Sequence, residues 1–241
     1  AKQKYRVLVQ DRYRRGGPRY QYVLTIHKPQ PDFYAAVIHS QNPGPGAMNI
    51  WRGGAAWFDV SVHQKDGFAG PLTITAENLP AGVHASPVVM QNATSGAFVV
   101  WADDNAAETE AYFDLVAKSK VDGKEIVREV RPYARVWSST DMNSSRPTRR
   151  AALSIRDKAP YSLRFAQERI EIAAGGKGEV KLLLNRIWPE FKNDVNIQGI
   201  NIPGQIKPQL AKISAGQTEI AVPIEIQNGT KPGEYSIVVT G

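Results

Sequence analysis

The chain has 241 residues, 42% of them hydrophobic, and a formal net charge of +7 at neutral pH. This length suits two domains of roughly 100 residues, each large enough to bury a core without a metal or a disulfide. Cysteine is absent, which excludes disulfides, thiolate zinc sites, iron–sulfur clusters and cysteine nucleophiles, and no apolar run approaches the ~20 residues of a membrane-spanning helix.

The positive charge is concentrated at the N-terminal end of the chain. Residues 1–30 contain a single acidic residue, Asp11, and eight basic ones. The basic residues are Lys2, Lys4, Arg6, Arg12, Arg14, Arg15, Arg19 and Lys28. The remaining residues carry equal numbers of basic and acidic side chains, so both expected domains are neutral overall and the basic character is local.

Two aromatic and β-branched runs, residues 5–9 and 20–26, predict strands within the first 30 residues. A polar loop joins them, so we expect residues 1–30 to form a β-hairpin, the remnant of a preceding β-sandwich. Because a strand-like run begins almost at once and no initiating Met is present, we expect a piece of a longer protein. Pro29 and Pro31 predict a stiff, extended connector to the next domain.

One pattern occurs twice along the rest of the chain. A glycine pair, Gly53-Gly54 and again Gly175-Gly176, precedes a run in which every second residue is apolar. The apolar positions are Phe58, Val60 and Val62 in the first copy and Val180, Leu182 and Leu184 in the second. Alternation of this kind is typical of a half-buried strand, so the repeat predicts two related β domains.

Short strands separated by turn signals continue through both halves. The dipeptide Asp122-Gly123 lies between the strand-like runs 113–118 and 125–130 and predicts a hairpin. Residues 139–150 are polar and small, which is typical of a linker. We therefore predict an all-β fold of two tandem immunoglobulin-like (fibronectin-type) β-sandwiches, over 31–138 and 151–241, preceded by the β-hairpin.

The residues that could carry catalysis or bind metal form no convergent pattern. The four histidines have no ligand-like spacing, and they are His27, His39, His63 and His84. No Gly-x-Ser-x-Gly motif is present, and Asp103-Asp104-Asn105 lacks the spacing of a calcium loop, which favours a solvated turn. The sequence thus predicts no catalytic residue, no metal site and no cofactor, although the distant carboxylates of a glycosidase would leave no local pattern.

Two groups of side chains are candidates for binding. Trp51, Trp57 and Trp101 are candidate ligand contacts, because exposed indoles offer flat apolar platforms on which sugar rings stack; the alternative is that they pack beneath loops or against a neighbouring domain. The residues Arg12, Arg14, Arg15 and Arg19 are interleaved with tyrosines and are candidates for docking a polyanion. The alternative for this group is a hairpin with a basic outer face and buried tyrosines.

Several strings resemble known bacterial modules. The strings Ile50-Trp51-Arg52-Gly53-Gly54, Gly67-Phe68-Ala69-Gly70-Pro71-Leu72 and Leu79-Pro80-Ala81-Gly82-Val83 resemble the immunoglobulin-like modules of planctomycete-type exported multidomain proteins. Residues 5–26 resemble the tail of a bacterial pre-peptidase C-terminal domain, itself a β-sandwich. The resemblance implies export, a multidomain parent and a non-catalytic role, and it supplies no functional residues.

These observations lead to one preferred function and two alternatives. We expect a non-catalytic structural spacer and protein-interaction module, not an enzyme, within a larger extracytoplasmic or cell-surface bacterial protein. The expected partners are other domains or subunits of a larger assembly, or an acidic protein or polysaccharide, with no specific nucleic acid and no membrane span. The alternatives are a carbohydrate-binding or adhesion module that uses exposed tryptophans, and an accessory domain of a secreted hydrolase.

Overall fold

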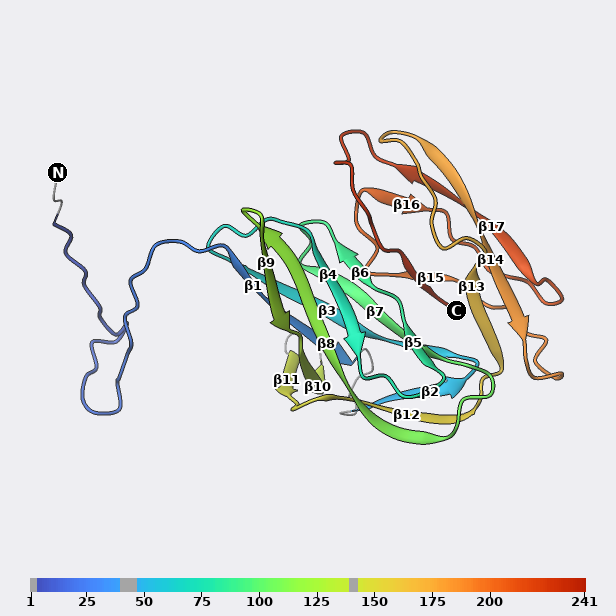
Figure 1. Ribbon diagram of the computed structural model, residues 1–241, viewed down its shortest axis with the longest axis horizontal. Coiled ribbons are helices and arrows are strands. Elements are labelled where there is room, and N and C mark those ends of the chain that lie inside the picture. The colour runs from blue at the N-terminus through green and yellow to red at the C-terminus, as the bar shows by residue number, and fades with distance from the viewer. Residues whose placement is uncertain (1–3, 40–46, 139–142) are drawn as a thin grey trace.

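The computed structural model describes residues 4–39, 47–138 and 143–241. Within these ranges every regular element is a β-strand, and the strands form two bodies with an arm at the N-terminal end (Figure 1). Among the described residues there is no helix long and apolar enough to cross a membrane. The predicted all-β class and the tandem sandwiches are confirmed.

The first domain is a sandwich of two sheets. One sheet has the order β11-β10-β1-β3-β7-β5, with β1 (Asp32–His39), β3 (Ala55–Lys65), β5 (Val83–Ala85), β7 (Ser95–Ala102), β10 (Arg131–Ser138) and β11 (Asn143–Pro147). The other has the order β2-β12-β8-β4-β6, with β2 (Ala47–Arg52), β4 (Leu72–Glu77), β6 (Val88–Met90), β8 (Thr109–Val121) and β12 (Ala151–Lys158). Strand β9 (Lys124–Glu129) pairs with the second half of β8.

Alternating side chains build the first core. Phe58, Val60 and Val62 of β3 are buried, as the sequence pattern predicts, and Phe98 of the neighbouring β7 lies directly opposite Phe58. The predicted hairpin at Asp122-Gly123 is present, and both residues adopt positive φ, which matches the twist of the strands β8 and β9 that they join.

Strand β12 belongs to the first domain and not, as predicted, to the second. It pairs in parallel with β2 and antiparallel with β8, and its side chains Ala151, Leu153 and Ile155 are buried in the first core. The predicted linker 139–150 also differs from the structure, because its residues 143–147 form β11 beside β10, whereas 139–142 lie outside the described residues. The packing therefore places the domain boundary after Lys158 and not at residue 151.

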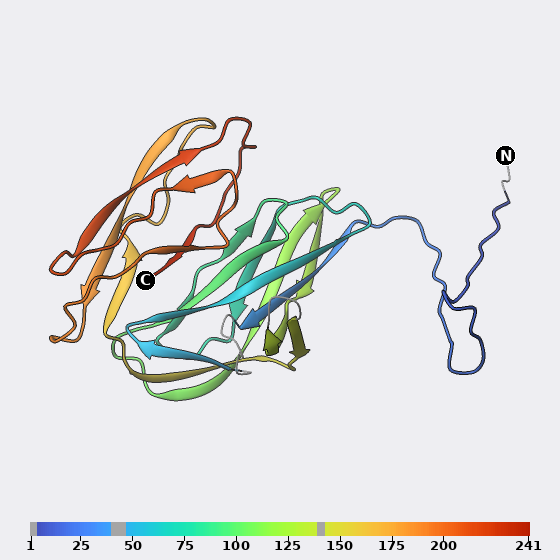
Figure 2. The same cartoon turned by 180° about the vertical axis from the view of Figure 1, so that it is seen from behind.

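The second domain is a smaller sandwich. A four-stranded sheet, β13-β14-β17-β16, faces the pair β15-β18 (Figure 2). The strands are β13 (Tyr161–Phe165), β14 (Lys177–Arg186), β15 (Gln198–Ile200), β16 (Ile206–Pro208), β17 (Glu219–Ile226) and β18 (Val238–Thr240). Val180, Leu182 and Leu184 point into a separate core, in agreement with the repeated pattern. The two cores have no buried residue in common, as is typical of two domains.

Residues 4–31, called the arm below, do not form the predicted hairpin. No strand is present between Lys4 and Pro31, and the arm extends away from the two sandwiches (Figure 1). An isolated two-stranded hairpin is only marginally stable, because it has no third strand or facing sheet to cover its apolar side chains. The runs 5–9 and 20–26 have strand-like sequences but lack a sheet to join.

Candidate functional site

The arm carries most of the exposed apolar side chains among the described residues. Leu8 is 83% exposed, Val23 is 90% exposed and Ile26 is 78% exposed. The other large exposed hydrophobic residues of the arm are Tyr5, Val7, Val9, Tyr13, Tyr20, Tyr22 and Leu24. Apolar area of this extent usually marks a surface that contacts a partner, so the arm is a candidate binding element.

The four arginines predicted to dock a polyanion lie together in the loop of the arm. The guanidinium of Arg15 lies 5.0 Å from the ring centre of Tyr13 and 5.5 Å from that of Tyr20, within the range of cation–π attraction. The guanidinium of Arg12 lies 5.8 Å from the Tyr13 ring centre. Arg14 and Arg19 are exposed in the same loop, and binding of a polyanion here stays a prediction.

Asp11 organises this loop. Its carboxylate accepts hydrogen bonds from the backbone N–H groups of Tyr13 at 2.8 Å and Arg15 at 3.2 Å. Both hydrogen bonds lower the pKa of Asp11 below its ordinary value, and the one from the Arg15 N–H has the larger effect. The carboxylate therefore closes the turn as an anion among the surrounding arginines.

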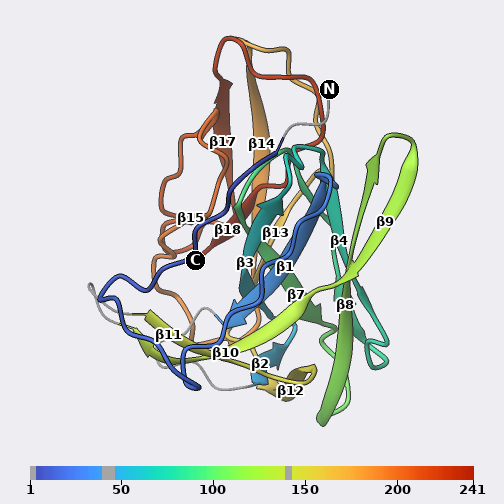
Figure 3. The ribbon, with the colours of Figure 1, turned by 90° about the vertical axis from the view of Figure 1, so that its left-hand side faces the viewer.

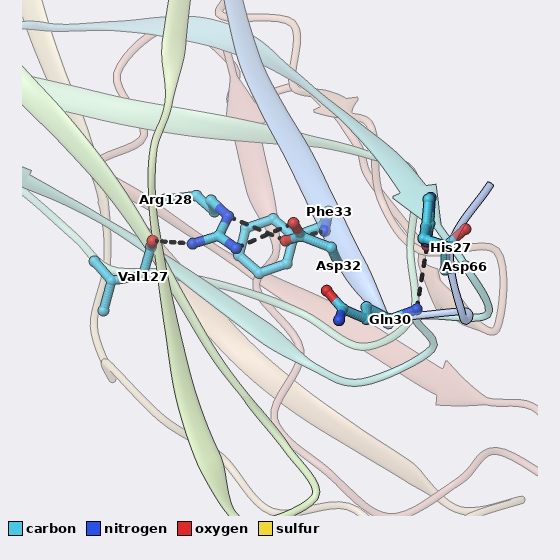
Figure 4. A network of polar contacts seen from close by, with 7 residues as sticks. All are labelled: His27, Gln30, Asp32, Phe33, Asp66, Val127 and Arg128. Carbon is cyan, nitrogen blue, oxygen red and sulfur yellow. Dashed lines mark hydrogen bonds and ion pairs between the residues drawn. The ribbon is translucent and has the colours of Figure 1, made fainter. Parts of the chain in front are cut away.

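The base of the arm is tied to the first sandwich at two points (Figure 4). The backbone N–H of Gln30 donates to the Asp66 carboxylate at 3.2 Å, and the His27 ring lies 3.8 Å from the same carboxylate. Next to this, Arg128 of β9 donates two hydrogen bonds to Asp32 at the start of β1. The arm is thus held against the turn that follows β3, and the residue directly after it, Asp32, is bound to β9.

The three candidate tryptophans do not form one platform. Trp57 and Trp101 are half-buried on the outer face of the same sheet, but Trp101 lies opposite Ala55 whereas Trp57 lies opposite Val99. Trp51 is 45% exposed and belongs to β2 in the other sheet. The structure therefore separates Trp51 from the other two indoles, which sequence reasoning had grouped together.

The junction between the sandwiches contains side chains that sequence reasoning missed. The Trp188 indole N–H donates to the carbonyl of Lys158 at 3.1 Å, and its ring packs edge-on against Trp51 with 6.2 Å between ring centres. The side-chain amide of Asn201 donates to the Gly96 carbonyl at 3.0 Å and to the Asp59 carboxylate at 3.2 Å. Both residues follow strands in turns, where no hydrophobic period indicates their partners.

A groove lies beside this junction. Two adjoining cavities of about 490 and 550 Å³ share the lining residues Gln91, Asn92, Gln205 and Tyr235. Among the described residues that line them, Lys231 alone is charged. A lining of amides, hydroxyls and apolar groups suits uncharged polar contacts more than acid–base chemistry.

The histidines do not converge in the structure. His39 is buried against Phe58, with 6.0 Å between ring centres, while His84 pairs with Asp103 at 3.1 Å. In the described ranges, no group of three or more His, Asp or Glu side chains is arranged so that it could hold a metal ion.

Comparisons with known proteins do not assign the chain to a family. No protein-family model matches the chain, and a search of curated proteins finds no match. A protein of unknown function from Porphyromonas gingivalis W83 aligns with 81% of this chain and 83% of its own, at 10% identity and a TM-score of 0.31.

Two surface proteins are also similar. The Escherichia coli adhesin FdeC aligns over 80% of this chain and 55% of its own, at 9% identity and a TM-score of 0.27. Domains 4–9 of the surface layer protein SbsC align over 87% of this chain and 29% of their own, at 14% identity and a TM-score of 0.32. Such low TM-scores indicate neither a shared function nor a shared partner.

Proposed function

We propose that this chain is a non-catalytic structural spacer and protein-interaction module of a larger extracytoplasmic or cell-surface protein. The observation that carries the proposal is the junction, where two separately packed sandwiches are joined by a short connector and by specific hydrogen bonds. A spacer needs this combination, because it must keep a fixed distance and angle between whatever lies on either side.

The connector leaves little freedom. After Lys158 at the end of β12, only Ala159 and Pro160 precede Tyr161 at the start of β13. The Ala159 N–H donates to the carbonyl of Arg52 at 2.8 Å, and the carbonyl of Pro160 accepts the N–H groups of Ile187 at 2.9 Å and Trp188 at 3.1 Å. Because the proline ring restricts φ, this connector resists bending.

Contacts between residues that line the groove support the same geometry. Asn201 bonds to Gly96 and Asp59, and the Val89 N–H donates to the Ser236 hydroxyl at 3.0 Å. A pair of domains joined by a connector alone could swing, but attachment at separated points restrains rotation about the connector.

The interaction part of the proposal rests on the arm. Its apolar and basic side chains are exposed and are not covered by either sandwich. The alternative carbohydrate-binding function has less support, since Trp51 lies apart from Trp57 and Trp101. Saturable quenching of tryptophan fluorescence by a polysaccharide would favour that alternative.

Distance measurements between the domains test the spacer. The chain has no cysteine, so Lys120→Cys and Lys207→Cys introduce one spin label on each sandwich without background. We expect a single narrow distance distribution, which broadens in the double variant Trp188→Ala/Asn201→Ala. Asn105→Ala, an exposed asparagine in a turn of the first domain, is the matched control and should leave the distribution narrow. A broad distribution in the otherwise unaltered chain would contradict the spacer function.

Cellular location is tested separately. An antibody against the chain should label intact cells if the protein is on the cell surface. If it lies beneath an outer envelope, the antibody should label the cells once that envelope has been removed. Recovery of the protein only from the cytoplasmic fraction would contradict the proposed location.

A further inference from the structure

The first run of the arm has the properties of a strand that has no sheet. Over residues 4–9, Tyr5, Val7 and Val9 alternate with Lys4, Arg6 and Leu8, so that an extended conformation has one apolar face and one mostly basic face. All six residues are exposed, and none of them lies in one of the described strands. Such a segment gains both backbone hydrogen bonds and apolar contacts when it joins a sheet edge.

Strand β9 offers an open edge of the right length. It has six residues, Lys124–Glu129, and among the described strands it pairs with β8 alone. Figure 3 shows β8 and β9 as a long hairpin at the margin of the first domain. Ile126 packs against the first core, whereas Val127 on the opposite face is 44% exposed.

Strand β9 has two acidic and two basic residues, and only the acidic ones lie on its outer face, since Lys124 and Arg128 are on the face of Ile126. Glu125 and Glu129 flank Val127 on the outer face of β9, and neither forms an ion pair with another described residue. The arm, by contrast, has seven basic residues and one acidic residue. Charged side chains protect an edge against unspecific pairing, and here they also select a basic strand.

The root of the arm lies beside the same edge. Arg128 of β9 binds Asp32, the first residue of β1, directly after Pro31 (Figure 4). Pro29 and Pro31 keep the root extended, and the arm leads away from its own sandwich (Figure 1). In a two-fold symmetric pair of chains, each arm would start next to the edge that receives the arm of the other chain.

We propose that two copies of this chain exchange arms, and that residues 4–9 of each copy add as an antiparallel strand to β9 of the other. In the proposed register Arg6 faces Val127, so Lys4 faces Glu129 and Val7 lies beside Ile126. Arg6 then reaches both glutamates across the diagonal. This inference names the partner for the interaction part of the proposed function, on which it rests, and it is independent of the geometry between the sandwiches.

Sedimentation of the full chain over a concentration series tests the exchange. We expect a monomer–dimer equilibrium that weakens as salt is added. The double variant Glu125→Lys/Glu129→Lys should weaken dimerisation at least ~10-fold, because like charges then face each other. Adding Lys4→Glu/Arg6→Glu to it should restore the dimer. The matched control Glu171→Lys/Glu179→Lys changes two exposed acids of the second domain and should leave dimerisation unchanged.

Hydrogen exchange locates the contact. In the dimer, the amides of residues 4–9 and of β9 should become protected together, while the loop 11–19 stays unprotected. A chain that remains monomeric at all concentrations would overturn the inference, as would a dimer that is indifferent to charge reversal on β9. If the chain stays monomeric but the distance distribution between the two domains is narrow, the arm exchange is wrong and the spacer function still stands. The two proposals can therefore be contradicted separately.

Discussion

Arg128 binds Asp32 through two parallel hydrogen bonds, from Nε to Oδ1 and from Nη2 to Oδ2, both 3.0 Å long. The pair connects β9, in one sheet of the first sandwich, to the start of β1 in the other. The hydrogen bond from Arg128 lowers the pKa of Asp32 below its ordinary value, which keeps the carboxylate ionised in mildly acidic solution. Both side chains are partly exposed, so water and salt weaken the pair.

Replacing Arg128 by Gln should lower the free energy of unfolding by about 1 kcal/mol at neutral pH, the upper range for an exposed ion pair with good geometry. The pKa of Asp32 is lower in the folded chain than in the unfolded chain. The ion pair therefore stabilises the fold above the unfolded pKa of ~3.9, and this stabilisation is lost as pH falls through the folded pKa. Urea unfolding of both proteins between pH 7 and pH 2 measures the difference. An equal difference at both ends of this range would contradict the assignment.

His39 should make the first domain sensitive to mild acid. The side chain is 4% exposed, and this burial is the main cause that lowers the pKa of its ring. The positive charge of the nearby Arg135 lowers the pKa further, whereas the negative charge of Asp59 raises it. A lowered pKa in the folded state means that the unfolded chain takes up a proton first, near pH ~6.5, so stability falls as pH decreases below that value. Unfolding free energies of the natural chain should therefore decline between pH 8 and pH 5.

The variant His39→Leu removes the titrating ring and should flatten this dependence, whatever its effect on absolute stability. The control is His63→Leu, which changes an exposed histidine on the neighbouring strand β3 and should leave the slope unaltered. Identical slopes for the natural chain and the His39 variant would show that His39 is not the group responsible.

Ile155→Ala should destabilise the first domain and spare the second. The side chain is 1% exposed in the first core, and truncating a buried isoleucine typically costs ~2–5 kcal/mol. Hydrogen exchange should accelerate in β8 and β3 and stay unchanged in β14 and β17. Leu182→Ala in the second core is the reciprocal control. Faster exchange confined to β14 and β17 in the Ile155 variant would assign β12 to the second domain instead.

Gly53→Ala should disturb the junction. Gly53 has a φ of +74°, and an added Cβ would clash with the Asp104 carboxylate and lie 2.9 Å from the Ile187 side chain of the second domain. The positive φ alone costs ~1–2 kcal/mol for a residue with a Cβ. Gly67→Ala isolates that part, since Gly67 has a similar φ of +82° but open space around its Cβ position.

We expect Gly53→Ala to be the more destabilising of the two in thermal unfolding, and to broaden the distance distribution between the spin-labelled domains. If both variants lose equal stability and neither alters the distances, then Gly53 matters only for the turn in which it lies.

The alternation of apolar side chains by itself determined which residues face a core. Phe58, Val60, Val62, Val180, Leu182 and Leu184 are all buried as predicted. The sequence also predicted the turn at Asp122-Gly123 correctly, because the positive φ values required between β8 and β9 favour this dipeptide. Both signals are local: they depend on residues within one strand or one turn.

Only the tertiary structure decided which strands pair. Nothing within residues 151–158 distinguishes a strand of the first sandwich from one of the second, since its partners β2 and β8 are distant in the sequence. For the same reason the sequence predicted a hairpin in the arm, where strand-like runs are present but no sheet covers them. Side-chain period determines which face of a strand is buried, whereas the partner depends on contacts between distant segments, as with Trp188 and Asn201 at the junction.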